Sequence, residues 1–228
     1  MATLAQAMGS TIGRKYVMAV TGLIWAGFLV SHLTANLLLL APDGGAAFNT
    51  YAHGLASLGP LLWAAELFLL VTLVTHVYNA VQINMAKRAA RSSRYQVSAN
   101  AGGSSRKTIA SLSMVYTGGL IAVFLVLHLI SFKWGTYYEV EVDGVMMRDL
   151  KRLVVESYQN PLQVGAYMLM MLILGLHLRH AIWSAFQSLG LGNPKWMGAV
   201  EKGGYAFAVL VALGFFVIPI AIFFGVGQ

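Results

Sequence analysis

Four long apolar stretches of the chain each contain at least one histidine, and in such a stretch an ionisable side chain is costly and is usually functional. The four stretches contain His32, His76, His128 and His177, and the last of them also contains His180. A neutral imidazole can fill an axial position of haem iron, bind zinc or carry a proton. A single buried histidine could simply bond to a neighbouring helix, but four in four separate stretches need a common explanation.

The composition indicates that a lipid bilayer surrounds these stretches. Of the 228 residues, 58% are hydrophobic and 10% are charged, and the mean hydropathy is +0.69. An ordinary soluble domain has about 25% charged residues. The chain has no cysteine, which excludes disulfides, thiolate metal sites and cysteine-bound iron–sulfur clusters within it. Basic loops of a membrane protein explain the net charge of +7 without a nucleic-acid partner.

Five stretches are long enough to cross about 30 Å of hydrocarbon as helices that rise about 1.5 Å per residue. The predicted helices cover residues 16–40, 61–85, 109–132, 161–186 and 205–225. We therefore expect an all-α integral membrane protein, a single domain over residues 1–228, whose first four helices form a bundle around the histidines. No internal repeat is evident. The amphipathic segment at 146–159 is expected to form a helix along the membrane surface.

The charges between the predicted spans indicate the topology. Arg14 and Lys15 precede the first span, and the loop at 86–108 holds six basic residues and no acidic one. The loop at 41–60 contains no lysine or arginine. Because basic loops concentrate on the cytoplasmic side, we expect the N-terminus in the cytoplasm and the C-terminus outside.

This orientation sorts the four histidines by depth. His32 lies 16 residues into the first span, roughly 24 Å from its cytoplasmic end. His128 lies 19 residues into the third span, which also runs outward. His76 and His177 lie 15 and 16 residues into spans that run inward. The sequence therefore predicts an outer pair, His32 with His128, and an inner pair, His76 with His177.

Two histidine pairs at two depths favour haem. Facing imidazoles fill both axial positions of a low-spin haem b inside a helical bundle, and two such haems would carry electrons across the bilayer. A zinc site would gather its ligands at one depth. A proton relay also uses histidines within membranes, but it does not need pairs matched in depth.

Four segments resemble a known family. They are "GRKYVMAVTGLIWAGFLVSHLTANL", "AAELFLLVTLVTHVYNAVQINMAKRAARSSRY", "FLVLHLISFKW" and "GLHLRHAIWSAFQSLG". Together they resemble the dihaem cytochrome b subunit of succinate:quinone oxidoreductases (succinate dehydrogenases and fumarate reductases), in the form where one five-helix polypeptide anchors the complex. The resemblance covers nearly the whole chain and keeps the order of the histidine-bearing helices.

This resemblance implies a membrane anchor in the bacterial cytoplasmic membrane, with no dicarboxylate chemistry of its own. Its partners would be a flavoprotein subunit with FAD and a subunit with iron–sulfur clusters, and the complex could form a higher oligomer. Electrons would pass between succinate or fumarate and a quinone, often menaquinone, through two haems b. By the same resemblance His32 and His128 would bind the distal haem, and His76 and His177 the proximal haem.

Two further ionisable residues are candidates for quinone chemistry. Glu66 lies near the outer start of the second span, where a carboxyl could exchange protons with a quinone or could simply bond to a neighbouring helix. His53 lies in the first loop and is either a surface residue or a contact of a quinone or haem propionate.

Basic side chains at the predicted cytoplasmic boundary could neutralise haem propionates or extend to lipid headgroups. They are Arg14, Lys15, Arg88, Arg106 and Arg179. Arg179 is the first choice because it lies two residues from a ligand. Several glycines could make room for porphyrin edges or serve helix packing. They are Gly22, Gly27, Gly118, Gly119 and Gly175.

His177 and His180 compete for one ligand position. They are roughly 60° apart around a helix and about 4.5 Å apart along it, so geometry alone does not choose between them. In the family pattern the ligand stands six residues before an aromatic, as His177 stands before Trp183. His180 is then expected to contact a propionate or the lipid surface.

Two other functions are consistent with the histidines. One is the dihaem quinol-oxidising subunit of a formate- or hydrogenase-linked dehydrogenase. The other is a haem-free transporter that uses histidines as proton carriers.

Overall fold

The computed structural model of the chain describes residues 6, 9–90 and 109–227, so Arg106 and most of the basic loop lie outside the described residues. Within them the chain is helical apart from one short hairpin. Five long helices are apolar enough to cross a membrane, which confirms the predicted spans. They are α2 (Thr11–Leu37), α4 (Pro60–Ala89), α5 (Ile109–His128), α7 (Pro161–Ser188) and α8 (Pro194–Phe223).

The start points of the helices follow from local capping. The Asn160 side chain accepts a hydrogen bond from the Leu162 amide at the start of α7, and Asn193 accepts one from the Lys195 amide at the start of α8. A proline follows each asparagine at the first helical position, where its missing amide hydrogen costs nothing. The fifth helix therefore begins at Pro194, eleven residues before the predicted start of the span.

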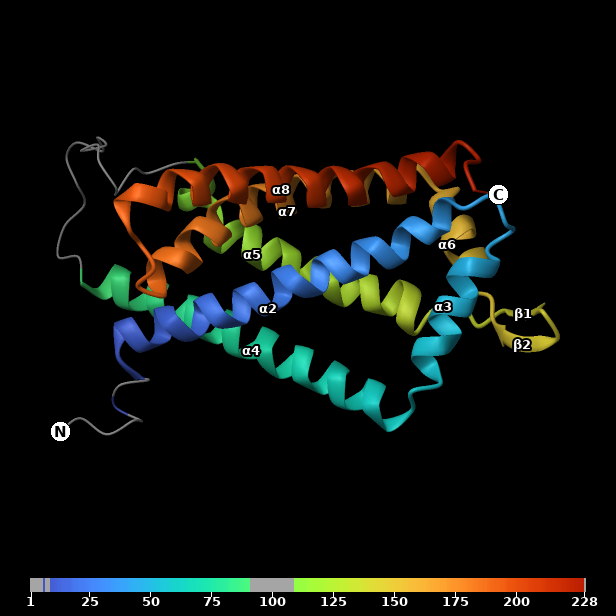
Figure 1. Ribbon diagram of the computed structural model, residues 1–228, viewed down its shortest axis with the longest axis horizontal. Coiled ribbons are helices and arrows are strands. Elements are labelled where there is room, and N and C mark those ends of the chain that lie inside the picture. Colours follow the sequence, from blue (N-terminus) through green and yellow to red (C-terminus); the bar gives the residue numbers. More distant parts are fainter. Residues whose placement is uncertain (1–5, 7–8, 91–108, 228) are drawn as a thin grey trace.

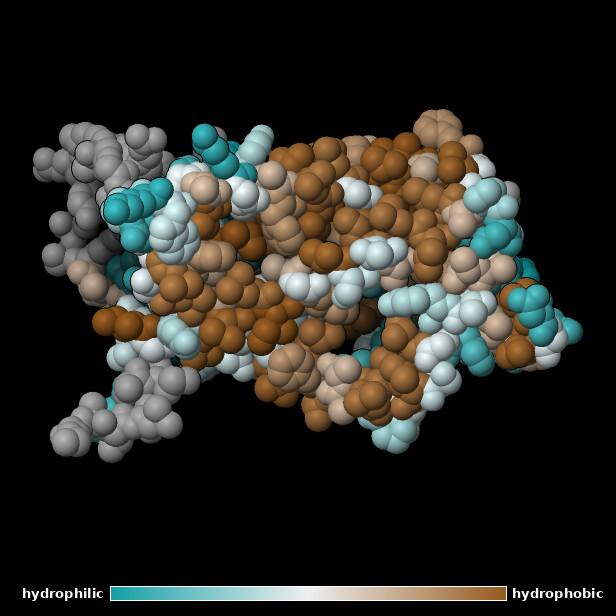
Figure 2. All heavy atoms as spheres, in the orientation of Figure 1, coloured by the Kyte–Doolittle hydropathy of each residue, from teal (hydrophilic) through white to brown (hydrophobic). Residues whose placement is uncertain are grey.

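The long helices run side by side between two polar ends (Figure 1). The start of α2 lies at one end, here called the N-terminal end. At the other, here called the hairpin end, lie α3 (Ala46–Ala56), α6 (Leu150–Tyr158), the β-hairpin and the C-terminus. Hydrophobic side chains cover the middle of the visible face, and hydrophilic ones gather towards both ends (Figure 2). This pattern is that of a helical protein surrounded by lipid.

Helix α2 is central to the bundle and contacts α4, α7 and α8, while α5 packs on α7. Helix α8 also belongs to the bundle, since it packs along α7. Residues Met171, Leu174 and Leu178 of α7 form a buried cluster with Ala208 and Val211 of α8. Helix α4 rests mainly on α2 and has little contact with α5.

The predicted helix at 146–159 is correct only from Leu150 onwards. Residues 146–148 belong to β2 (Val145–Arg148), which pairs antiparallel with β1 (Glu139–Val142). Asp143 and Gly144 form the turn and both have positive φ, 49° and 77°, as Asp-Gly hairpin turns require. The Asp-Gly pair beside alternating "EVEV" was the available sequence signal for this hairpin.

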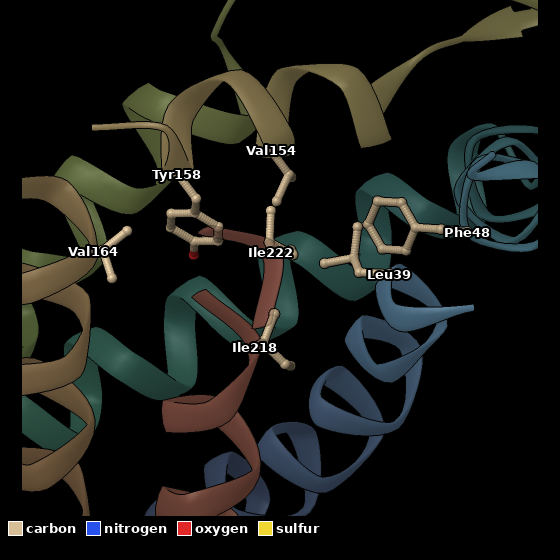
Figure 3. Close-up of a cluster of buried hydrophobic side chains, with 7 residues drawn as sticks. All are labelled: Leu39, Phe48, Val154, Tyr158, Val164, Ile218 and Ile222. Carbon is tan, nitrogen blue, oxygen red and sulfur yellow. The ribbon is translucent and has the colours of Figure 1, made fainter. Parts of the chain in front are cut away.

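A buried cluster holds the hairpin end together (Figure 3). Its side chains come from the short helix that follows α2 and from α3, α6, α7 and α8. They are Leu39, Phe48, Val154, Tyr158, Val164, Ile218 and Ile222. Leu39 lies in the short helix η1 (Leu38–Leu40), which continues α2. Because five helices meet here, this cluster fixes their relative positions at the hairpin end.

A buried lysine is part of the same region. Lys151 is 4% exposed, and its Nζ donates to the carbonyl oxygens of Leu39, at 2.6 Å, and of Gly227. Burial lowers the pKa of Lys151, and the charges of Asp43 and Asp149 oppose that shift. The lysine therefore joins α6 to the end of α2 and to the C-terminal segment.

Candidate functional site

The outer pair of histidines meets across two helices. His32 of α2 and His128 of α5 have ring centroids 5.9 Å apart, with their planes 88° from parallel. Both side chains are half-buried. These residues are 96 positions apart in sequence, and the fold brings them together as their predicted depths require.

Aromatic rings enclose the outer pair. Phe28 stacks on His32 with centroids 5.3 Å apart, and Phe215 of α8 lies 5.8 Å from the same ring. On the other side, the Tyr167 hydroxyl is 3.2 Å from His128 Nδ1. The π-helical segment η3 (Leu129–Lys133) begins directly after His128. π-Helical turns are frequent at functional sites.

The inner pair is held by hydrogen bonds at one ring nitrogen. His76 Nδ1 lies 3.1 Å from the Thr21 hydroxyl and 3.1 Å from the Met18 carbonyl oxygen, both on α2. His177 Nδ1 lies 3.1 Å from the Thr117 hydroxyl on α5. His76 of α4 thus contacts the preceding long helix, α2, and His177 of α7 contacts the preceding long helix, α5.

Two of the five predicted glycines adjoin these imidazoles. A Cβ atom at Gly22 would lie 3.1 Å from His76 Cε1, and one at Gly118 would lie 3.3 Å from His177 Cε1. Gly175 instead faces Ala212 of α8, so it serves helix packing, whereas a Cβ at Gly27 or Gly119 would meet nothing within 4 Å. Gly22 and Gly118 therefore permit the close approach of an inner histidine.

A short repeat links the two pairs, although no repeat was predicted. Thr21-Gly22 precedes His32 by eleven residues, and Thr117-Gly118 precedes His128 by the same interval. In each case the Thr-Gly step contacts the histidine of the next long helix. The sequence signal was a Thr-Gly pair at a fixed distance from a histidine, which hydropathy alone does not reveal.

The residues present fit two bis-histidine haems. Eleven helical residues separate the layers by about 16 Å, and between them on α2 lies Trp25. Its buried Nε1 has no hydrogen-bond partner among the described residues, so it is a donor available to a bound group. Within residues 6, 9–90 and 109–227, no three His, Asp or Glu side chains converge as metal ligands. Two imidazoles alone do not complete a tetrahedral zinc site, whereas they fill both axial positions of haem iron.

No family model, curated protein or solved structure matches the chain. The paired histidines and their surroundings are therefore the features that bear on function.

The predicted propionate contacts differ in their surroundings. Arg14 donates a hydrogen bond to Gln82 Oε1 at 3.1 Å and so joins α2 to α4 at the N-terminal end. Lys15 and Arg88 are exposed at that end. Arg179 is exposed, and its guanidinium lies over the Tyr205 ring of α8, 5.4 Å from the centroid. Of these, only Arg14 is held at the junction of two histidine-bearing helices.

The structure distinguishes His180 from His177. The His180 ring lies 6.2 Å from that of Trp183, one turn further along the same helix. Among the described residues, no hydrogen bond joins His180 to another helix, whereas His177 reaches Thr117. The surroundings of His177 are therefore those of a ring held in place from a second helix.

The two remaining candidates lie towards the hairpin end. His53 is exposed on α3. Glu66 of α4 forms an ion pair with Lys133, the last residue of η3, and both side chains remain about two-fifths exposed, at 40% and 38%. Lys133 was not predicted as the partner of Glu66, because the pairing depends on how α4 and α5 are rotated towards each other.

Proposed function

We propose that this chain is the membrane-anchor and electron-transfer subunit of a succinate:quinone oxidoreductase. It would pass electrons between an iron–sulfur subunit and a quinone, often menaquinone in the family it resembles, through two haems b. The observation that carries the proposal is the meeting of His32 and His128, 5.9 Å apart, one layer away from the inner histidines. Four helices contribute one histidine each, so the four imidazoles would hold two haems, which would supply single-electron transfer.

His32 with His128, and His76 with His177, would hold the two haems. When bound, haem iron supplies the ability to accept and release single electrons. The chain's own residues orient three of the four imidazoles, those of His76, His128 and His177, through contacts at Nδ1. Trp25 and Arg14 are the donors best placed for the polar edges of a bound group, since one lies between the layers and the other at the N-terminal end.

Glu66 would exchange protons with the quinone. Quinone reduction consumes two protons with two electrons, so a carboxylate near the quinone shortens the proton path. Glu66 is accessible in the isolated chain and lies towards the hairpin end, where the outer pair also lies. Proton exchange would therefore occur on the side of the outer haem.

The charge distribution supports the proposed partners and orientation. The N-terminal end carries Arg14, Lys15 and Arg88, and by the positive-inside rule it would face the cytoplasm. The iron–sulfur subunit, and through it the flavoprotein subunit with FAD, would dock at this end. The membrane would be the bacterial cytoplasmic membrane.

The decisive measurement is a reduced-minus-oxidised absorption spectrum of the purified chain, with the haem quantified per polypeptide. Two haems b per chain are expected. A spectrum without haem b would refute the proposal and favour a haem-free transporter. Co-purification with a flavoprotein and an iron–sulfur subunit, with succinate-dependent quinone reduction, would distinguish it from a formate- or hydrogenase-linked cytochrome b.

A further inference from the structure

We propose that Thr21 and Thr117 are positioning residues that fix the inner histidines in the tautomer whose Nε2 is free to bind iron. This inference rests on the proposed haem-binding function and deepens it, because it assigns a role to residues outside the ligand set. It concerns the inner pair only.

The hydrogen bonds of Thr117 determine where its hydroxyl hydrogen goes. A threonine hydroxyl has one hydrogen to donate. The Thr117 hydroxyl donates to the Ser113 carbonyl oxygen at 3.0 Å, with the Met114 carbonyl at 3.2 Å. The oxygen lone pairs are left for His177 Nδ1, 3.1 Å away. With the hydroxyl hydrogen directed at the Ser113 carbonyl, we assign the hydrogen of this contact to Nδ1, which leaves His177 Nε2 as the bare nitrogen.

Thr21 imposes the same tautomer on His76. Its hydroxyl donates to the Val17 carbonyl oxygen at 2.8 Å, so it too accepts from His76 Nδ1. The Met18 carbonyl oxygen lies 3.1 Å from the same nitrogen, and a carbonyl can only accept. Two acceptors thus require a hydrogen on His76 Nδ1.

The two threonines are not equivalent. His76 keeps the Met18 carbonyl as an acceptor if the Thr21 hydroxyl is removed. His177 Nδ1 has Thr117 as its acceptor, with no second one among the described residues. Removing the Thr117 hydroxyl should therefore affect its histidine more than removing that of Thr21.

Neither ring of the outer pair contacts a threonine whose hydroxyl donates to its own helix, among the described residues. His128 Nδ1 faces the Tyr167 hydroxyl, and the Asn36 amide nitrogen is 3.4 Å from either ring nitrogen of His32. A hydrogen bond from a ligand's second nitrogen raises the basicity of the ligand, and a more basic ligand favours the oxidised iron. The threonines should therefore lower the reduction potential of the inner haem and leave the outer haem unaffected.

The experiment compares Thr117→Val, Thr117→Ser and Thr21→Val with Thr72→Val in the intact complex. Valine keeps the shape of threonine but removes the hydroxyl, and serine restores the hydroxyl. Thr72 is the matched control, because it is buried on α4 and its hydroxyl donates to the Leu69 carbonyl of the same helix. The readouts are haem retained per chain and an equilibrium redox titration, with the inner haem identified as the one lost in His177→Ala.

Thr117→Val should weaken retention of the inner haem about tenfold and raise its potential. A tenfold change in the one-electron equilibrium corresponds to about 59 mV. Thr21→Val should give a smaller shift in the same direction, and both Thr117→Ser and Thr72→Val should resemble the wild type. If the inner haem is lost outright from Thr117→Val but kept in the serine variant and the control, the proposal is also supported.

An unchanged potential and haem content in Thr117→Val would overturn this inference. An equal loss of haem or an equal shift in potential in Thr72→Val would overturn it too. The effect would then follow from the removal of any buried hydroxyl. A wild-type chain without haem would instead refute the proposed function, so the two failures are distinguishable.

Discussion

The Lys133 ammonium forms an ion pair with the Glu66 carboxylate and so joins the end of η3 to the first turns of α4. The position of Lys133 is itself fixed from the hairpin. The Arg148 guanidinium donates to the carbonyl oxygens of Phe132, at 3.0 Å, and of Lys133, at 3.2 Å. Cations at a helix C-terminus interact favourably with its unpaired carbonyls. A carboxylate, a cation and the hairpin therefore form one connected unit at the hairpin end.

Replacing Glu66 with glutamine should impair quinone turnover and leave both haem spectra intact. Glutamine keeps the size of the side chain but cannot exchange a proton, and the loss of a general acid or base typically costs at least about 100-fold in rate. The measurement is succinate-dependent quinone reduction, with the difference spectrum recorded on the same sample.

Glu156→Gln is the matched control, because Glu156 also lies at the hairpin end and forms an ion pair with Arg152, at 2.8 Å. Exposed pairs of this kind contribute little to stability, so the control should turn over like the wild type. Undiminished turnover in Glu66→Gln would remove this carboxyl from the mechanism.

The sequence predicted the parts of the site that depend on position along a helix. Positions along the predicted spans grouped His32 with His128, and these two rings do lie next to each other. The contacts of Thr21, Thr117 and Lys133 were not predicted, because they depend on how each helix is rotated about its axis. In a soluble protein the division between an apolar and a polar face reveals this rotation, but a helix surrounded by lipid is apolar on every side.

His177→Ala should lose the inner haem, whereas His180→Ala should keep it. The reason is that His177 is oriented by Thr117 from α5, while the His180 ring contacts Trp183 of its own helix. The difference spectrum of His177→Ala should fall to about half if each haem absorbs alike. If His177→Ala kept both haems and His180→Ala lost the inner haem, His180 would be the ligand and His177 would not.

Single cysteines can test the proposed orientation, since the chain has none of its own. Leu58 is 47% exposed between α3 and α4, and Lys87 is exposed near the end of α4. In intact cells a membrane-impermeant maleimide should label Leu58→Cys but not Lys87→Cys. Lysed membranes should allow labelling of both. The opposite pattern in intact cells would place the N-terminal end outside.

Lys151→Met should lower the thermal midpoint of the purified chain. Methionine fills similar space but leaves the carbonyl oxygens of Leu39 and Gly227 without this donor. An unsatisfied buried acceptor costs about 1–3 kcal/mol of stability. For a chain of this size, each kcal/mol lost lowers the thermal midpoint by roughly 2–4 °C. Lys195→Met, at an exposed lysine, is the control and should leave the midpoint unchanged.

The stability of the wild type should also depend on Lys151 at high pH. Burial lowers the pKa of Lys151 from its ordinary value of 10.5, so just below pH 10.5 the unfolded chain binds more protons than the folded chain. Stability then rises with pH across that window, because burial disfavours the charged form of Lys151 and raising the pH removes that charge. As the pH approaches 10.5, the thermal midpoint of the wild type should therefore rise relative to that of Lys151→Met. Parallel pH profiles for the two proteins would mean that the buried amine is charged to the same extent in the folded and unfolded chains.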